Sequence, residues 1–347
     1  MKLKSLLLGS AAAMLAGTSS FAADAVVAEP EAVEYVRVCD AYGAGYFFIP
    51  GTERCMQLSG EVRFQYQIVD ADDALADDVD GDWAYRARFA VRTANESDFG
   101  TIRTYMRFEG NVSDPVQASV NIQEMSLDIG GFTAGYTDNY WTTNTGYGIL
   151  GAVNDGYYGY DQALYVEYNY EVAGFAVTAG VEQTTADNLP TFGNYTFAEN
   201  PNFYVGANYG GSWGQVGATY YYDQFFDDSS YKLGIDLVPF EGFRAEAFVT
   251  FGDGQYARAA RGGLAGDYTY GVGAQYTFGQ FTPYALYTGT DGVNTDYASV
   301  GLVYRPESTQ GLVLQAEATF ATEDNTAAFG GASVGDDVYT FRLIKSF

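Results

Sequence analysis

The sequence predicts an all-β fold, a transmembrane antiparallel β-barrel, and three features of the chain carry this prediction. From about residue 57 to the end, apolar and polar residues alternate with a period of two in one segment after another. Short turns such as Gly130-Gly131 are interleaved with long acidic loops such as 185–200, and the chain closes on Phe347. A soluble β-sandwich also alternates, but it does not account for loops that are long on one side only. Nor does it account for aromatic residues crowded at strand ends, as in Tyr220-Tyr221-Tyr222, a placement typical of the aromatic girdles at a lipid interface.

Residues 1–22 have the pattern of a secretory signal peptide. Lys2 and Lys4 form its charged region, an apolar stretch follows, and small residues then allow cleavage after Ala22 or Ala23. The alternative is an N-terminal membrane anchor, but the apolar stretch is about half of the ~20 residues that a spanning helix needs. We therefore expect the chain to be exported.

The two cysteines of the chain, Cys39 and Cys55, both lie in residues 23–56, which we interpret as a periplasmic N-terminal extension. An even count in an oxidising compartment favours one disulfide that closes a short loop. Two free buried thiols are the alternative. Without histidine, two thiolates leave a zinc site incomplete, and the acidic loops lack EF-hand spacing, so no metal site is predicted.

Residues 57–347 are expected to form the barrel. The sixteen alternating segments in this range begin near residues 57, 82, 101, 119, 131, 161, 174, 202, 212, 230, 242, 267, 280, 294, 310 and 336. The fourth is the least regular because its alternation slips at Glu124-Met125, so fourteen or eighteen strands are also compatible with the pattern. Sixteen strands enclose a lumen too wide for side chains to fill, and water would occupy it.

Arginines gather on the polar face of the first three segments. A charged side chain that faces lipid near the bilayer midplane costs several kcal/mol, so these arginines are expected to face the lumen and line the pore. The alternative is a set of ordinary strand charges, paired locally with Asp and Glu. The arginines are Arg63, Arg86, Arg88, Arg92, Arg103 and Arg107.

The third long loop spans roughly residues 138–161 and carries Asp138, Asp155 and Asp161. If it folds into the lumen, its carboxylates oppose the arginines and set up a transverse electric field across a constriction. Long glycine-rich loops are commonly mobile surface segments, so the loop's own sequence does not decide between the two positions.

The composition argues against several classes of protein. The chain has no histidine, which removes Ser-His-Asp and HExxH chemistry and argues against a barrel lipase or protease; neither enzyme activity nor a cofactor is predicted. A net charge of −27 argues against nucleic acid as a partner. A substrate-specific channel would need an aromatic track along the lumen, and Tyr105, Tyr165 and Phe248, the aromatics expected to face inward, form none.

The segment from Val36 to Cys55, which contains Cys39-Asp40-Ala41-Tyr42-Gly43, is followed by Leu58-Ser59-Gly60-Glu61 at the start of the first strand. Together with the terminal Phe347, these residues resemble the alphaproteobacterial (rhizobial-type) general porins. The likeness extends over the whole mature chain; the cysteine segment is its specific part, whereas a final Phe is common to outer-membrane barrels.

The resemblance implies a homotrimeric, 16-stranded pore in the bacterial outer membrane for passive diffusion of ions and small hydrophilic solutes. It also implies that the third extracellular loop folds inward and that the barrel-assembly machinery recognises the strand ending at Phe347. Outer-membrane lipid and lipopolysaccharide would surround such a barrel. The acidic outer loops are then either solvated tips or sites where divalent cations bridge to lipopolysaccharide.

Overall fold

The computed structural model describes residues 37–70, 80–113, 117–145, 148–156, 159, 162–184, 201–224, 226–260, 266–291, 293–321 and 337–347. The predicted signal peptide, 1–22, lies outside this part of the chain, as do the acidic loops 185–200 and 322–336. Within the described part, no helix is long and apolar enough to cross a membrane.

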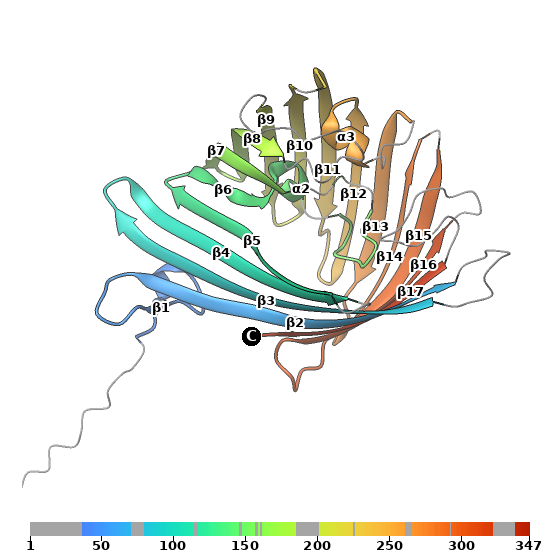
Figure 1. Ribbon diagram of the computed structural model, residues 1–347, viewed down its shortest axis with the longest axis horizontal. Helices are drawn as coiled ribbons and strands as arrows, with labels where there is room; N and C mark the ends of the chain where they lie inside the picture. Colours follow the sequence, from blue (N-terminus) through green and yellow to red (C-terminus); the bar gives the residue numbers. More distant parts are fainter. Residues whose placement is uncertain are drawn as a thin grey trace, which may run out of the picture. The chain divides into compact units, whose positions relative to one another are not determined.

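The described chain is nearly all β-structure (Figure 1). Its three short helices are η1 (Asp40–Tyr42), α2 (Tyr140–Thr143) and α3 (Gln255–Ala260). The strands are β1 (Phe47–Phe48), β2 (Cys55–Asp70), β3 (Asp80–Ser97), β4 (Gly100–Ser113), β5 (Gln117–Ile129), β6 (Phe132–Asp138), β7 (Gln162–Val172), β8 (Phe175–Thr184), β9 (Asn202–Gly211), β10 (Gly214–Asp223), β11 (Asp228–Leu237), β12 (Phe243–Gly252), β13 (Tyr268–Tyr276), β14 (Phe281–Thr290), β15 (Val293–Tyr304), β16 (Leu312–Ala321) and β17 (Asp337–Ser346).

Strands β2 to β17 form a closed antiparallel barrel of sixteen strands. Each strand pairs with the next along the chain, and β17 pairs back onto β2 over a register that runs from Asp337 opposite Asp70 to Ser346 opposite Glu61. Every strand begins within two residues of the position predicted from the sequence. The prediction of a sixteen-stranded barrel is therefore confirmed.

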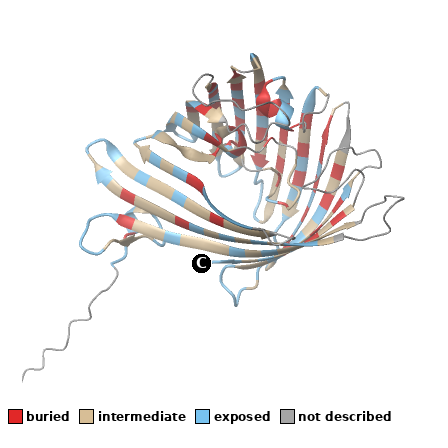
Figure 2. Cartoon of the chain, viewed as in Figure 1, coloured by how far each residue is buried: buried red, intermediate tan, exposed pale blue. Residues whose placement is uncertain are grey.

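Exposed and less exposed residues alternate along many of the barrel strands (Figure 2), and the exposed residues of the outer face include many large apolar side chains. On the outer face, Phe64 is 43% exposed and Phe341 is 52% exposed, whereas Thr340, the neighbour of Phe341, is 1% exposed. An outer surface of exposed apolar side chains is suited to contact with lipid. The closed ladder of hydrogen bonds leaves no unpaired strand edge at the seam between the first and last barrel strands.

Strand β5 carries a bulge at the point where the sequence alternation slips. Arg107 on β4 is opposite Glu124, but the next residue, Phe108, is opposite Ile122, so Gln123 is extra. The extra residue brings two consecutive polar side chains, Gln123 and Glu124, to the same place, and both are buried. The irregular fourth segment is thus a real feature of the strand, and it positions part of the site described below.

The N-terminal segment is tied to the start of the barrel. Cys39 and Cys55 form the predicted disulfide, and both are buried. Strand β1 pairs with the first residues of β2. Tyr42 Oη donates a hydrogen bond of 3.0 Å to Glu96 Oε1 near the end of β3. Restraining a loop of 16 residues stabilises this segment by about 3 kcal/mol on the chain-entropy view.

The C-terminal residue closes the seam between β17 and β2. Phe347 and Gly60 exchange two backbone hydrogen bonds of 3.0 Å. The Phe347 ring lies directly over Gly60, where an added Cβ would come within 2.4 Å of the ring. Glycine at position 60 is therefore required by close approach of an aromatic ring, a pairing that protects strand glycines in β-sheets.

Candidate functional site

The predicted arginines lie on β2, β3 and β4, on one part of the inner wall. Arg63 on β2 is directly opposite Arg86 on β3, and Arg88 is opposite both Glu61 on β2 and Glu109 on β4. Strand alternation aims all of these side chains into the lumen, because their sequence neighbours Val62, Phe89 and Met106 are exposed on the outer face.

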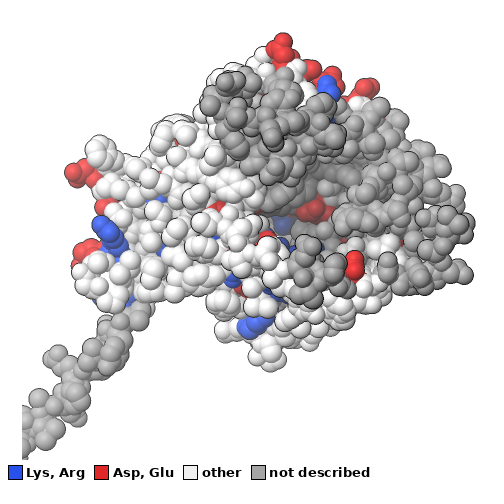
Figure 3. Space-filling model, in the orientation of Figure 1, with Lys and Arg blue, Asp and Glu red and all other residues white. Residues whose placement is uncertain are grey.

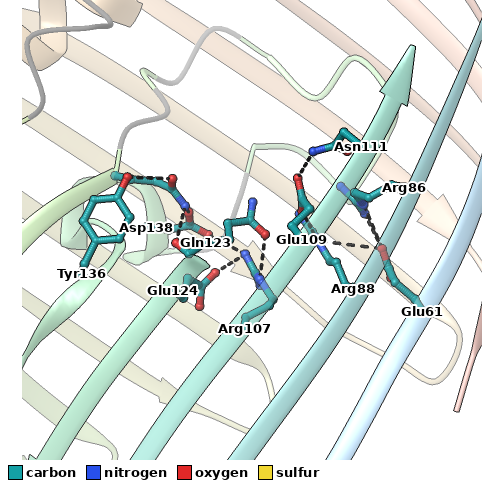
Figure 4. Close-up of polar contacts among 11 residues, drawn as sticks. Glu61, Arg86, Arg88, Arg107, Glu109, Asn111, Gln123, Glu124, Tyr136 and Asp138 are labelled. Carbon is teal, nitrogen blue, oxygen red and sulfur yellow. Dashed lines mark hydrogen bonds and ion pairs between the residues drawn. The ribbon is translucent and has the colours of Figure 1, made fainter. Parts of the chain in front are cut away.

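Carboxylates on the same wall compensate two of these arginines (Figure 4). Arg86 Nη2 lies 2.5 Å from Glu61 Oε1, and Arg88 Nη1 lies 3.8 Å from the same oxygen. Arg88 also pairs through Nε with Glu109, which accepts a further hydrogen bond of 2.8 Å from Asn111 Nδ2. Arg86 and Arg88 thus share two carboxylates in an alternating network across three strands.

Arg107 joins the wall to the start of the third long loop. Its Nε donates to Gln123 Oε1 at 2.9 Å, and its Nη2 pairs with Glu124 and lies 3.8 Å from Asp138 Oδ2 (Figure 4). Glu124 and Asp138 are 5% and 4% exposed. Of the three predicted loop aspartates, Asp138 therefore meets a predicted arginine, and the bulge in β5 supplies the other two groups.

Two further arginines of the predicted set, Arg92 on β3 and Arg103 on β4, also have local partners. Arg92 Nη1 donates to Gln57 and Ser59 at 3.4 and 3.3 Å, and its guanidinium lies 4.4 Å from the centre of the Tyr105 ring. Arg103 Nη1 lies 3.5 Å from Asp128 Oδ1, with its side chain 57% exposed. Local pairing, the alternative that the sequence left open, thus accounts for much of the charge on this wall.

Arg63 is the exception, and it has a companion that sequence reasoning missed. Among the described residues, Arg63 makes no hydrogen bond or ion pair, and its electrostatic neighbours include Arg342, Arg86 and Arg88. Arg342 on β17 donates from Nε to Gln65 Oε1 at 2.6 Å and makes no ion pair with a described carboxylate. The sequence pattern does indicate that Arg342 faces the lumen, because Arg342 alternates with the outward-facing Phe341 and Leu343.

The third long loop begins with α2, which is fastened to the opposite wall. Asn139 caps the helix by accepting a hydrogen bond from Thr142 N. Trp141, which is fully buried, donates from its backbone N to Tyr221 Oη at 3.0 Å and accepts at its carbonyl from Lys232 Nζ at 2.8 Å. Tyr221 lies on β10 and Lys232 on β11, so the loop starts against these two strands.

The position of Tyr221 corrects one interpretation of the sequence. From the sequence, the run Tyr220-Tyr221-Tyr222 is expected to lie in an aromatic girdle at the lipid interface. Tyr220 is 36% exposed, but Tyr221 is 1% exposed and packs with the Trp141 and Tyr256 rings, at centroid distances of 5.8 and 4.8 Å. Alternation sends the middle residue of such a run to the other face of the sheet.

Beyond α2, backbone amides of the loop are held by side chains of the inner wall. Leu150 N donates to Glu246 on β12, and Val153 N and Asn154 N donate to the two oxygens of Glu317 on β16 at 2.7 and 2.8 Å. Gly156 N donates to Tyr297 Oη on β15 at 2.9 Å. The described loop residues therefore follow the inner wall from β10 to β16.

Wall glycines make room for the loop. An added Cβ at Gly234 on β11 would lie 2.3 Å from Thr145 Oγ1, and one at Gly217 on β10 would lie 2.5 Å from Thr145 Cγ2. On β13, an added Cβ at Gly271 would lie 2.6 Å from Ile149 Cδ1. Thr145 also has a positive φ of 67°, which is costly for a β-branched residue and is held here by packing in this notch.

The loop aspartates do not face the six predicted arginines as a set. Asp155 interacts electrostatically with Lys232 on β11 and with Arg342 on β17. Asp161 lies outside the described residues. Acidic and basic groups thus meet across the lumen mainly through residues that the sequence analysis did not single out.

The inner surface as a whole is polar and charged, and Figure 3 shows acidic and basic side chains together inside the hollow of the molecule. In the part of the chain that the structure describes, no cluster of three or more His, Cys, Asp or Glu side chains is arranged to hold a metal ion. A closed sixteen-stranded barrel that is apolar outside and charged inside is a water-filled channel through a membrane.

Comparison with known proteins assigns the family. The family model of the porin subfamily matches residues 24–341, and the chain belongs to this family. It is 32% identical over 333 residues to porin Omp2b of Brucella suis, covering 88% of this chain and 89% of the relative. It is 33% identical over 339 residues to porin Omp2a of Brucella ovis, covering 88% of this chain and 94% of the relative.

Solved structures share the fold at low sequence identity. A triple mutant of the Rhodopseudomonas blastica porin superposes with a TM-score of 0.56 at 13% identity, covering 84% of this chain and all of that one. Salmonella typhi OmpF in a complex with daunomycin gives a TM-score of 0.62 at 12% identity, covering 85% and 98%. The chain is thus a passive-diffusion porin, a multi-pass protein of the bacterial outer membrane, as the resemblance implied.

Proposed function

We propose that ions and small hydrophilic solutes pass between the arginine wall of β2–β4 and the loop that begins at Asp138. The wall residues are Arg63, Arg86, Arg88, Arg92, Arg103 and Arg107, and the constriction loop contributes Asp138, Asp155 and Asp161. The main support is the chain of hydrogen bonds that fastens loop backbone from Trp141 to Gly156 along β10 to β16. With the loop on that side, the open passage lies on the side of the arginines.

We also propose that the protein has no enzyme activity and uses no cofactor. The chain lacks histidine, and described lumen carboxylates such as Glu61 and Glu317 are engaged in ion pairs or in hydrogen bonds to loop amides. Its role is then to set the size and electric field of a passage, which needs fixed charges and no reacting group.

We expect the wild type to show modest cation selectivity, which grows as the salt concentration is lowered. The net charge of −27 should concentrate cations at the mouths of the pore, whereas wall arginines and loop aspartates partly cancel inside. At physiological salt, screening over about 8 Å weakens the electrostatic effect of charges at the mouths, and lowering the salt concentration restores this effect. Single-channel conductance and reversal potential in planar bilayers measure this. Anion preference at both low and high salt would contradict it, and absence of conductance would contradict the pore itself.

Neutralising Arg86, Arg88 and Arg103 together should raise cation preference, and neutralising Asp155 and Asp161 should lower it. Each substitution removes a fixed charge of one sign from the passage, so the reversal potential should move in opposite directions for the two sets. If neither set shifted the reversal potential, the proposed field would be absent.

We further propose a homotrimer embedded in outer-membrane lipid and lipopolysaccharide, assembled by machinery that recognises the last strand and Phe347. Small outward-facing residues on β3 and β4, such as Ala87 and Thr104, permit close packing of subunits. Light scattering or native mass spectrometry in mild detergent should give the mass of three chains, and a monomeric mass would contradict this proposal.

A further inference from the structure

Two guanidiniums of the lumen, those of Arg63 and Arg342, make no ion pair with a described carboxylate, and they are neighbours. Arg63 on β2 is opposite Ile344 on β17, so Arg342, two residues before Ile344, is its diagonal neighbour on the lumen face. Diagonal side chains across a ladder are about 7–8 Å apart, within reach of two long arginines. The two groups also interact electrostatically.

The placement of charge around this pair is unfavourable for folding. Arg63 is opposite Arg86, and like charges directly opposite one another in a sheet are destabilising. The carboxylates nearby are already used: Glu61 pairs with Arg86 and Arg88, and Glu317 accepts hydrogen bonds from two loop amides. Glu61 still attracts Arg63, and Glu317 attracts Arg342, but neither carboxylate forms an ion pair with them. Several N–H donors of the two guanidiniums therefore have no partner among the described residues.

The chemistry of the pair defines what would neutralise it. A guanidinium has five N–H donors in a planar fork that fits carboxylate or phosphate oxygens in a bidentate way. Arg342 uses Nε on Gln65, and no described residue accepts from Arg63. Both side chains are only partly buried, so a solute in the lumen can reach them.

We propose that Arg63 and Arg342 form an oxyanion subsite of the channel, which transiently binds small solutes through a carboxylate or phosphate group. The subsite rests on the proposed path between wall and loop. Arg86, Arg88, Arg103 and Arg107 serve chiefly as partners of wall carboxylates. Asp155, which interacts with Arg342 from the loop side, limits dwell time by competing for the same guanidinium.

The test compares R63Q/R342Q with the wild type and with the control variant R305Q in planar bilayers. Arg305 follows β15, outside the arginine wall of β2–β4, where it is exposed and donates to Thr282 Oγ1 at 3.3 Å. Inorganic phosphate, and separately succinate, is added to potassium chloride while the current is recorded. We expect either oxyanion to reduce the wild-type current, with this block lost in R63Q/R342Q and kept in R305Q.

The ratio of anion to cation permeability gives a second reading. It should fall about tenfold in the double variant and less than about twofold in R305Q, because a unit charge near the ion path acts more strongly than an exposed, screened one. Block by both oxyanions supports a general subsite, and block by phosphate or succinate alone identifies the solute class. A conducting wild type that neither oxyanion blocks, or equal shifts in R63Q/R342Q and R305Q, would overturn the subsite.

The variant R63K/R342K separates binding from simple attraction. Lysine keeps the charge but not the planar fork, so the permeability ratio should persist while oxyanion block weakens. Unchanged block would overturn the bidentate assignment. Heat-modifiable migration on gels confirms that each variant is folded. A folded wild type without any conductance would instead refute the proposed pore, and the two failures are therefore distinguishable.

Discussion

Replacing Arg107 with methionine is expected to lower the free energy of unfolding of the barrel by about 3–5 kcal/mol. Its guanidinium contacts Gln123, Glu124 and Asp138, and the two carboxylates are almost fully buried. Removing the one cation leaves both carboxylates without compensation, close to each other. Urea titration of tryptophan fluorescence in lipid vesicles measures the loss.

Two further variants sharpen this prediction. Arg103→Met removes an arginine from the same strand, but its pair with Asp128 is exposed, so a change within about 1 kcal/mol is expected. Adding Glu124→Gln and Asp138→Asn to Arg107→Met should recover most of the loss, since no buried charge remains. A loss for Arg107→Met no larger than that for Arg103→Met would show that the network does not stabilise the barrel.

Replacing Glu317 with alanine is expected to free the later part of the constriction loop and raise single-channel conductance. The Glu317 carboxylate accepts from Val153 N, Asn154 N and Tyr284 Oη, at 2.7, 2.8 and 2.6 Å. Hydrogen bonds to a charged acceptor contribute about 1.5–3 kcal/mol each, so their combined loss should release the backbone from the wall. Planar-bilayer recordings would show a larger mean conductance and more current noise.

The controls separate the loop contact from the charge. Glu171→Ala removes the same charge from an exposed site that contacts Asn169 and no described loop residue, so conductance should stay unchanged. Glu317→Gln removes the charge but keeps one acceptor oxygen, so its effect should be intermediate. Equal conductance in Glu317→Ala and the wild type would mean that Glu317 does not anchor the loop.

The strands could be predicted from sequence because their pattern is imposed residue by residue. Lipid requires apolar side chains at every second position, as at Phe341 and Leu343, and turn residues mark the ends of each strand. Even the bulge at Gln123 was visible as a slip in alternation. The Cys39–Cys55 disulfide followed equally from cysteine count and compartment.

The path of the loop could not be predicted in the same way. Its partners Lys232, Glu246 and Glu317 lie about 90 to 165 positions later in the chain, and no local pattern indicates that a strand side chain will form a hydrogen bond with a distant backbone group. The wall glycines beneath the loop also resemble ordinary strand glycines in sequence. Arg342, by contrast, was readable from alternation alone, and Tyr221 from the same rule.

The way in which the loop is fastened has a consequence for how the channel can be altered. Between Leu150 and Gly156, the wall holds the loop by its amide groups, and every residue type except proline supplies such a group. At Val153, which is only partly buried, the side chain can therefore be exchanged while the backbone keeps its course. Substitution at such a position can change which solutes cross the membrane without altering the barrel that holds the loop.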